Sequence, residues 1–421
     1  MTATAARAGE AAAPEVLRRT LTVLVVSQAL GGAGMAAGIT VGALLAEDLL
    51  GSTGLAGLPT ALFTAGAALG AAVIGRVSQR RGRRPGLALG HGAAALGSAG
   101  VVAGAAAQWA WLLLVSLFVY GAGTATGLLA RYAGADLAPP ERRGRATGRV
   151  LLATTLGAVA GPNLVGPTGS LAEAWGIPRL AGPFLLAAVA YAAAGLVLLL
   201  WLRPDPLLLA RAAQRHEPVT ARAEGASGRF APGVVTGATV MITAQLVMIA
   251  VMTMTPVHMA GHGHSTQAVG LVIALHVGAM FLPSPLSGLL ADRFGRLPVA
   301  AASGAVLLGA GLLAGLAPPG GVFWPACALV VLGVGWNLAL VSGTALITDA
   351  APAQSRASVQ GLVDVGMSLA GATGGMASGL VVAGGGYPLL AVAAGALALA
   401  VIPVVAVRGR GAGPGAPEHG L

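Results

Sequence analysis

The stretch GLLADRFGRL, Gly288 to Leu297, ends a long apolar run, and GRVSQRRGRR, Gly75 to Arg84, ends another run much earlier in the chain. The two stretches share both glycines and two arginines at equivalent positions, but the earlier one has Gln79 where the later one has Asp292. An ungapped offset of 213 residues relates Gly75 to Gly288. The same offset relates residues further along: Asp136 to Asp349, Pro139 to Pro352, Arg143 to Arg356 and Gly148 to Gly361. The chain therefore contains an internal repeat of two related halves.

The composition indicates that the repeat belongs to a membrane protein. Hydrophobic residues make up 56% of the chain, charged residues make up 9%, and the mean hydropathy is +0.82. Soluble domains usually carry about 25% charged residues. This chain has too few charges to cover its surface in water, so a lipid bilayer is the expected solvent. The single cysteine, Cys327, excludes an internal disulfide and a cysteine metal cluster.

Twelve stretches are long and apolar enough to cross a bilayer as helices, for which about 20 residues are needed. They cover residues 20–46, 53–75, 86–107, 109–135, 147–169, 181–202, 233–257, 267–290, 298–317, 321–348, 361–383 and 387–407. A polar interruption at 203–232 separates the first six from the last six. The predicted organisation is an N-tail (1–19), a first half (20–202), a linker (203–232), a second half (233–407) and a C-tail (408–421).

The positive charges predict the orientation in the membrane. The formal net charge is +10, and the arginines gather in both tails, in the linker and in the loops after every second span. Arg179 stands alone in a loop on the other side. Cytoplasmic loops are enriched in arginine and lysine, so both termini and the linker are expected in the cytoplasm, at the cell inner membrane. The charge thus marks topology and contact with the lipid bilayer, and nucleic-acid binding is excluded.

Two homologous halves of six spans are typical of transporters built from parallel repeats. The predicted fold class is an all-α membrane protein, with twelve transmembrane helices in two pseudo-symmetric six-helix bundles. An axis along the membrane normal is expected to relate the bundles.

The repeated stretch resembles the cytoplasmic signature of the major facilitator superfamily, Gly-x-x-x-Asp-Arg-x-Gly-Arg. The later copy matches it in full, and the earlier copy matches it except at Gln79. The matching residues are Gly288, Asp292, Arg293, Gly295 and Arg296, and Gly75, Arg80, Gly82 and Arg83. The resemblance covers about residues 20–407 and implies a transporter that alternates between two open states.

The charged residues of the signature predict a latch that holds the cytoplasmic side shut. A carboxylate is stabilised at a helix N-terminus, so Asp292 is expected to face the start of span five, near Thr147–Gly148. Gln79 is expected to face the start of span eleven, near Gln360–Gly361, without the stabilising charge. The alternative is that these residues only anchor the topology.

Two arginine–aspartate pairs are expected to belong to the same latch. Arg83 is expected to reach Asp136 at the end of span four, and Arg296 to reach Asp349 at the end of span ten. Because both pairs recur at the offset of 213, we interpret them as paired elements of one device.

Span five contains GAVAGPNLVG, with Gly157, Gly161, Pro162 and Gly166. It resembles the Gly-x-x-x-Gly-Pro-x-x-Gly-Gly element of proton-coupled antiporters, mainly drug exporters, and departs from it at Val165. Small residues let helices approach closely, and an internal proline bends a helix. The resemblance implies export, and ordinary packing of small residues is the alternative.

Arg131 and Asp364 lie within the predicted spans, where polar groups are costly and default to functional hypotheses. Antiporters of this branch often carry an arginine in span four at the position of Leu117, but the arginine of this span is Arg131. Arg131 is predicted either to pair near the cytoplasmic end or to couple protons. Asp364 in span eleven is predicted to exchange a proton or to pair with Arg131 or Arg149.

Three amides, Gln245, Asn337 and Asn163, lie deeper in the spans. Each is a candidate for substrate contact, and each could equally form a hydrogen bond to a neighbouring helix. The sequence leaves this choice open.

No hydrolase, nucleotide-binding or metal motif occurs in the sequence, so we expect neither an enzyme nor a cofactor. The predicted function is a monomeric secondary transporter that exports small, mostly apolar drugs or secondary metabolites against protons by rocker-switch alternation. The alternatives are uptake or facilitated transport of a small metabolite, and a non-transporting sensor with the same fold.

Overall fold

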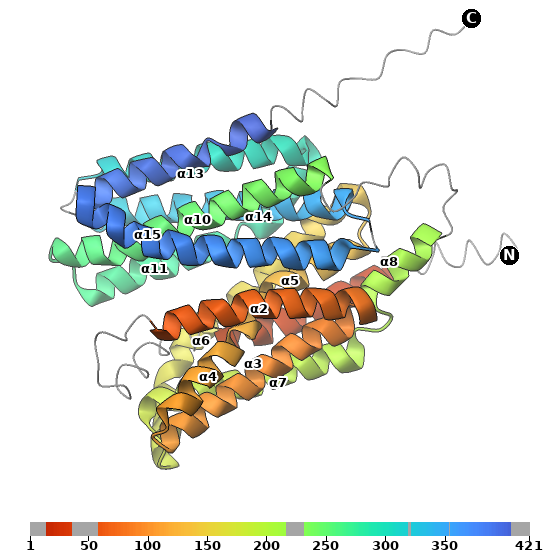
Figure 1. Ribbon diagram of the computed structural model, residues 1–421, viewed down its shortest axis with the longest axis horizontal. Coiled ribbons are helices and arrows are strands. Elements are labelled where there is room, and N and C mark those ends of the chain that lie inside the picture. Colours follow the sequence, from red (N-terminus) through yellow and green to blue (C-terminus); the bar gives the residue numbers. More distant parts are fainter. Residues whose placement is uncertain (1–13, 36–57, 216–230, 319–320, 353, 406–421) are drawn as a thin grey trace, which may run out of the picture.

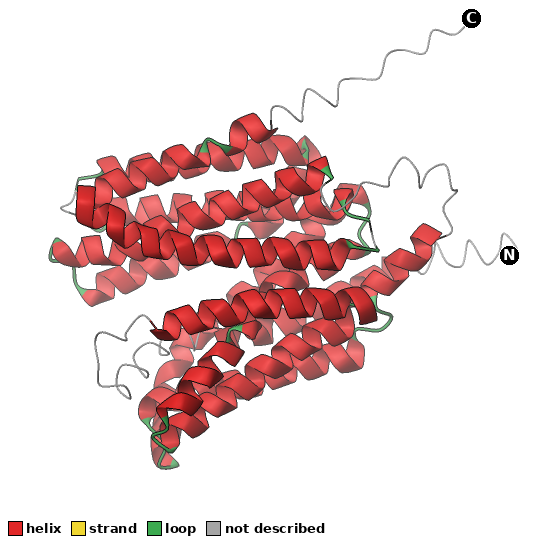
Figure 2. Cartoon of the chain, viewed as in Figure 1, coloured by secondary structure: helices red, strands yellow, loops and turns green. Residues whose placement is uncertain are grey.

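The computed structural model describes residues 14–35, 58–215, 231–318, 321–352 and 354–405, and these residues are almost entirely helical (Figure 2). Within them, nine stretches are long and apolar enough to cross a membrane. One of these, Arg356–Val405, contains two crossings because the chain turns at Gly386, which has a φ of 78°. The helix at 14–35 and the helix that begins at Arg143 complete the predicted twelve-helix fold.

After the helix at 14–35, the first half continues through six helical segments that form five spans. They are α2 (Leu58–Arg81), α3 (Arg83–Ala106), α4 (Ala110–Tyr120), α5 (Ala122–Asp136), α6 (Arg143–Ala174) and α7 (Gly182–Trp201). The segments α4 and α5 form one span that is interrupted at Gly121. The structure begins α6 at Arg143, earlier than the predicted residue 147.

The second half repeats this arrangement. Its helices are α10 (Pro232–Gly261), α11 (Thr266–Phe281), α12 (Ser284–Phe294), α13 (Arg296–Leu316), α14 (Phe323–Ala350) and α15 (Arg356–Ala398). The segments α11 and α12 form one span that is interrupted at Leu282 and Pro283, because proline cannot continue the hydrogen bonding of a helix. Gly82 before α3 and Gly295 before α13 both have a positive φ, 99° and 95°, so glycine is needed at both tight turns.

One helix was not predicted. The start of the linker forms α8 (Pro206–Arg215), which is too short to cross a membrane and is strongly amphipathic. Leu207 on its apolar face is fully buried, and α8 packs against α5. Its short length and mixed composition hide such a helix from a search for apolar spans.

The two halves lie side by side, the first half below the second in Figure 1. The contact between them is made mainly by α2 with α15 and by α6 with α12. Leu96, Leu316 and Leu380 are among the large apolar side chains exposed on the bundles, at 74%, 74% and 78%. Such exposure suits contact with lipid chains. We call the end of the molecule at which α8 lies the linker end, and the opposite one the far end.

Candidate functional site

Asp292 closes one side of the linker end. Its Oδ1 accepts a hydrogen bond from the N–H of Gly144, and its Oδ2 accepts one from the N–H of Arg145, both at 2.9 Å. The carboxylate is 2% exposed, and the Arg145 guanidinium lies 3.4 Å from it. It therefore satisfies free N–H groups at the start of α6. The sequence predicted the correct helix but placed the contact further along it, at Thr147–Gly148, because α6 begins earlier than expected.

Gln79 occupies the equivalent place against α15. Its Oε1 accepts hydrogen bonds from the N–H groups of Ala357 at 3.0 Å and Ser358 at 3.3 Å, and its amide donates to the carbonyl of Gln354. Ala357 and Ser358 are related to Gly144 and Arg145 by the offset of 213. The amide thus reproduces the geometry of Asp292 without its charge, one turn before the predicted Gln360–Gly361.

Glycines bring the backbones of the two halves together at the linker end. A Cβ atom on Gly148 would lie 2.2 Å from the carbonyl oxygen of Ser284, and one on Gly75 would lie 3.0 Å from Gly361 Cα. Gly288 is similarly close to Gly144. Helices that approach so closely leave no room for side chains. The linker end is therefore closed in this structure.

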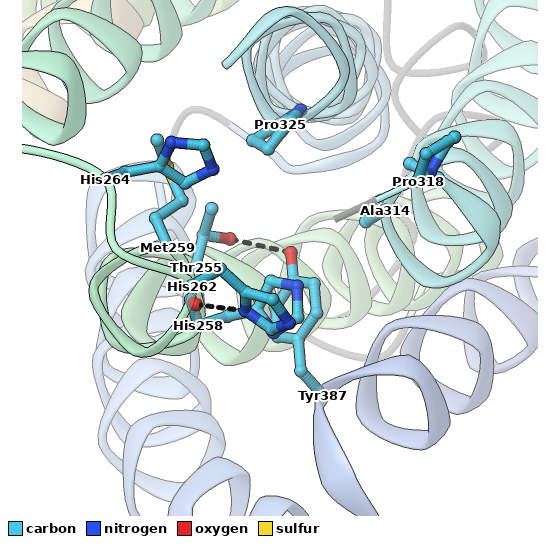
Figure 3. Close-up of a pocket in the computed structure, with 10 residues that line it drawn as sticks. Thr255, His258, Met259, His262, His264, Ala314, Pro318, Pro325 and Tyr387 are labelled. Carbon is cyan, nitrogen blue, oxygen red and sulfur yellow. Dashed lines mark hydrogen bonds between the residues drawn. The ribbon is translucent and has the colours of Figure 1, made fainter. Parts of the chain in front are cut away.

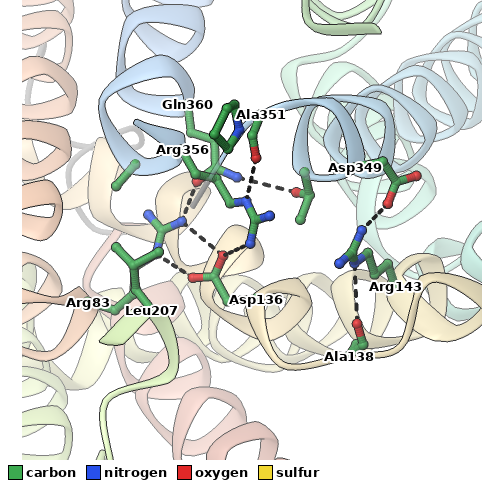
Figure 4. Close-up of polar contacts among 12 residues, drawn as sticks. Arg83, Asp136, Ala138, Arg143, Leu207, Asp349, Ala351, Arg356 and Gln360 are labelled. Carbon is green, nitrogen blue, oxygen red and sulfur yellow. Dashed lines mark hydrogen bonds and ion pairs between the residues drawn. The ribbon is translucent and has the colours of Figure 1, made fainter. Parts of the chain in front are cut away.

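Asp136 lies at the centre of the first ionic cluster (Figure 4). The Nε of Arg83 lies 2.8 Å from its Oδ2, and Nη1 of Arg356, from the other half, lies 3.8 Å from its Oδ1. Arg83 also donates to Oε1 of Gln360 on α15. Arg83 and Asp136 are almost fully buried. The pair expected within one half is therefore also a junction between the halves.

Asp349 is the centre of the second cluster. The Nε of Arg296 lies 2.6 Å from its Oδ2. Arg143 of the first half donates to its Oδ1, as Figure 4 shows. Arg143 and Arg356 are related by the repeat, so each aspartate binds one arginine of its own half and one of the other half. This cluster is more exposed than the first, 28% at Asp349. The remaining signature arginines, Arg80 and Arg293, are exposed.

A third ion pair lies between the halves within the membrane-spanning helices. Nη2 of Arg131 on α5 lies 2.6 Å from Oδ1 of Asp364 on α15, and the side chains are 0% and 2% exposed. Arg131 also donates to Thr344 Oγ1 at 2.9 Å and to Tyr132 Oη at 3.1 Å. Of the two partners considered for Asp364, the structure selects Arg131. A buried pair of this kind is costly to break, because either charge alone would lack a partner.

The sequence contained an unused signal for this network. Thr344 is the residue that the offset of 213 assigns to Arg131, so the arginine binds its own counterpart across the pseudo-twofold axis. The cross-half roles of Arg143 and Arg356 were also missed, although the repeat relates these residues.

The candidate amides are held by neighbouring helices. Oε1 of Gln245 accepts a hydrogen bond from Nε1 of Trp336 at 2.7 Å. Asn337 is fully buried and donates to the carbonyl of Met280 and to Ser284 Oγ, at 2.7 and 2.6 Å. Asn337 therefore joins α14 to the α11–α12 span. Gln245 is less buried than Asn337, since part of its side chain remains exposed.

The span-five motif lies within the helical part of α6. The side-chain surroundings of Gly157, Gly161, Pro162 and Asn163 lie outside the described residues. Gly166 is exposed, and a Cβ atom there would meet no atom within 4 Å.

A small pocket lies at the far end, within the second half (Figure 3). The ring of His258 stacks on that of Tyr387 with centroids 4.3 Å apart, and the ring centroid of His262 lies 4.3 Å from that of His258. The hydroxyls of Thr255 and Tyr387 are hydrogen-bonded at 2.8 Å. Over the described part of the chain, no group of three or more His, Cys, Asp or Glu side chains could hold a metal ion.

With this geometry established, comparison with known proteins assigns the chain to a family. The model of the Major Facilitator Superfamily matches residues 24–374 and 238–419. The chain belongs to the major facilitator superfamily. It is a transporter and not an enzyme.

Relatives within the superfamily cover most of the chain. The uncharacterized MFS-type transporter YddS of Bacillus subtilis (strain 168) is 51% identical over 383 residues, which cover 90% of this chain and 88% of YddS. The riboflavin transporter RfnT of Brucella anthropi is 32% identical over 357 residues, 82% of this chain and 85% of RfnT.

Solved structures of the superfamily share the fold. The human organic anion transporter MFSD10 (TETRAN) has a TM-score of 0.74 and 17% identity, with 92% of this chain and 99% of that chain covered. The proton:xylose symporter XylE has a TM-score of 0.73 and 17% identity, with 94% and 96% covered. At this identity, the likeness concerns the fold alone.

Proposed function

We propose that this chain is a proton-coupled secondary transporter that exports small, mostly apolar compounds by rocker-switch alternation. The observation that carries the proposal is the buried pair of Arg131 and Asp364, since each residue belongs to a different half. Any motion that opens the linker end must separate these two charges.

The charges at the linker end support a cytoplasmic position for this end. Arginines gather there in both repeats, as expected for the cytoplasmic side of a membrane protein. The present state is then closed to the cytoplasm, with the two ionic clusters and the Asp292 and Gln79 contacts as its latch. Opening inward separates α2 from α15 and α6 from α12.

A proton that Asp364 takes up from the outer side, while the linker end is closed, provides a means of opening. The neutral carboxyl no longer attracts Arg131, so the halves can separate; no unpaired carboxylate stays buried, and water that enters the open linker end solvates the Arg131 guanidinium. Once the linker end is open, water reaches the carboxyl, which releases its proton to the cytoplasm. Substrate then returns the carrier to the present state as the ion pair re-forms. One cycle thus moves a proton inward and a substrate outward.

Flux in proteoliposomes with an imposed pH gradient tests this proposal. We expect the gradient to drive substrate accumulation by the wild type and not by Asp364→Asn, which keeps the shape of the side chain without a titrating group. The matched control is Glu173→Gln, which removes an acid from an exposed pair with Arg179 at the far end. Substrate flux through the wild type that ignores the gradient would disprove proton coupling.

A second candidate function is transport of a flat heteroaromatic metabolite, by uptake or facilitated diffusion. It is favoured by the 32% identity to the riboflavin transporter RfnT. The substrate panel should therefore include riboflavin beside apolar drugs, with flux measured in both directions. Import of riboflavin without export of any apolar compound would favour this candidate, and no flux with any compound would favour a sensor.

A further inference from the structure

The linker forms hydrogen bonds with the first copy of the signature, in which Gln79 replaces the acid. Oδ2 of Asp205 accepts a hydrogen bond from the N–H of Arg84 in the first turn of α3, at 2.7 Å. Its Oδ1 accepts from the N–H groups of Leu207 and Leu208 in the first turn of α8, at 3.0 and 3.3 Å. One carboxylate therefore caps two helix starts, where negative charge is stabilised.

Among the residues that the structure describes, this contact has no counterpart in the second half. A Cβ atom on Gly82 would lie 2.4 Å from Oδ2 of Asp205, so the turn before α3 is closed by the linker carboxylate. A Cβ atom on the equivalent Gly295 would meet only the ring of Pro298, at 3.6 Å. The acid of the linker therefore lies at the first copy of the signature, where Gln79 replaces the acid of the second.

A second bond connects the linker to Gln79 itself. Nη2 of Arg211 on α8 donates to the backbone carbonyl of Gln79 at 2.7 Å. This bond holds the last turn of α2, whose Gln79 side chain reaches the start of α15. The buried Leu207 lies beside Arg83 in Figure 4, and α8 packs on α5, which carries Asp136. We call the Gln79 contact and the Asp136 cluster the first latch. The linker thus contacts the start of α3, the end of α2 and α5, the three elements that carry this latch in the first half.

We propose that Asp205 and Arg211 are positioning residues of the first latch, and that they hold Gln79 in the place where an uncharged amide can bind α15. The equivalent second latch, which consists of the Asp292 contact and the Asp349 cluster, needs no such support, because the charged Asp292 binds α6 directly. The inference concerns the equilibrium between closed and open linker ends and is independent of proton coupling or substrate.

The test measures the fraction of molecules whose linker end is closed. Spin labels report two distances there, one between the ends of α2 and α15 and one between the ends of α12 and α6. We expect Asp205→Asn and Arg211→Gln each to lower the ratio of closed to open molecules about two- to fivefold, the range of a charge at a helix terminus. Glu173→Gln is the control, since Glu173 is an exposed acid at the far end and takes no part in the latch.

Gln79→Ala separates positioning from other effects. If Asp205 acts through Gln79, then Asp205→Asn should cause no further change in the closed fraction once Gln79 is alanine. An equal loss in both backgrounds would overturn the proposal. It would also fail if Asp205→Asn and Arg211→Gln lower the melting temperature but leave the distance distribution equal to that of Glu173→Gln.

Discussion

One charge distinguishes the two halves at the scale of single residues. Asp292 and Gln79 accept the same two N–H bonds at equivalent helix starts, but only Asp292 adds the attraction between a carboxylate and the helix dipole. In a partly buried setting this attraction amounts to ~1–2 kcal/mol. The two sides of the linker end are therefore expected to differ in strength.

This difference can be removed in either direction. Gln79→Asp should increase the closed fraction of the linker end, because it adds a carboxylate at the start of α15. Asp292→Asn should decrease that fraction, because it leaves an amide at the start of α6. Spin-label distances across the linker end report both changes. Unchanged distances in both variants would refute the latch role of these residues.

At the scale of helices, closure depends on backbones that approach at glycine. Gly148 faces the carbonyl of Ser284, and Gly361 faces Gly75, with no space for a Cβ atom in either contact. The two contacts belong to α6–α12 and to α15–α2, which the repeat relates. Closure of the linker end thus depends on the close packing of these two helix pairs rather than on any single bond.

Gly148→Ala and Gly361→Ala should each shift the carrier away from the closed state, because the new methyl group would overlap backbone atoms of the other half. The readout is the accessibility of cysteines introduced at the linker end to a water-soluble thiol reagent. Gly309→Ala is the control, since a Cβ atom there meets no atom within 4 Å and the gain in helix propensity is the same. Equal accessibility in all three variants would exclude a role for close packing in closure.

At the scale of the whole molecule, the ion pair of Arg131 and Asp364 joins the two halves at a place away from the signature. The two side chains are buried as an ion pair while the halves are in contact at the linker end. Removing one partner from a buried pair typically costs about 3–5 kcal/mol, whereas replacing both by apolar residues can be nearly neutral. This contrast separates stability from function.

Arg131→Met alone should therefore lower the thermal stability of the purified protein substantially, by an amount of this order. Combining it with Asp364→Leu should restore most of that loss, while transport driven by a pH gradient remains absent. Thermal unfolding and flux are measured on the same preparations. A double variant that regains gradient-driven flux would show that the pair serves stability alone.

Much of the fold could be predicted from the sequence. Runs of about 20 apolar residues specify helices wherever the solvent is lipid, and the twelve-helix fold was confirmed. The charged residues of the repeated signature also predicted that Arg83 would meet Asp136 and that Arg296 would meet Asp349, and the structure places these pairs 2.8 and 2.6 Å apart.

Partners across the two halves depended on the tertiary structure. Nothing local to Arg143 or Arg356 indicates that each binds the aspartate of the opposite half, and Asp364 had two candidate arginines of equal merit in sequence. The position of Asp205 was hidden for the same reason. Hydropathy predicts which segments lie in lipid, and the repeat shows which segments of the two halves are equivalent. Both can be read from short stretches of sequence. Which charge meets which depends on how two bundles pack, and that is decided by the shapes of whole helix faces together.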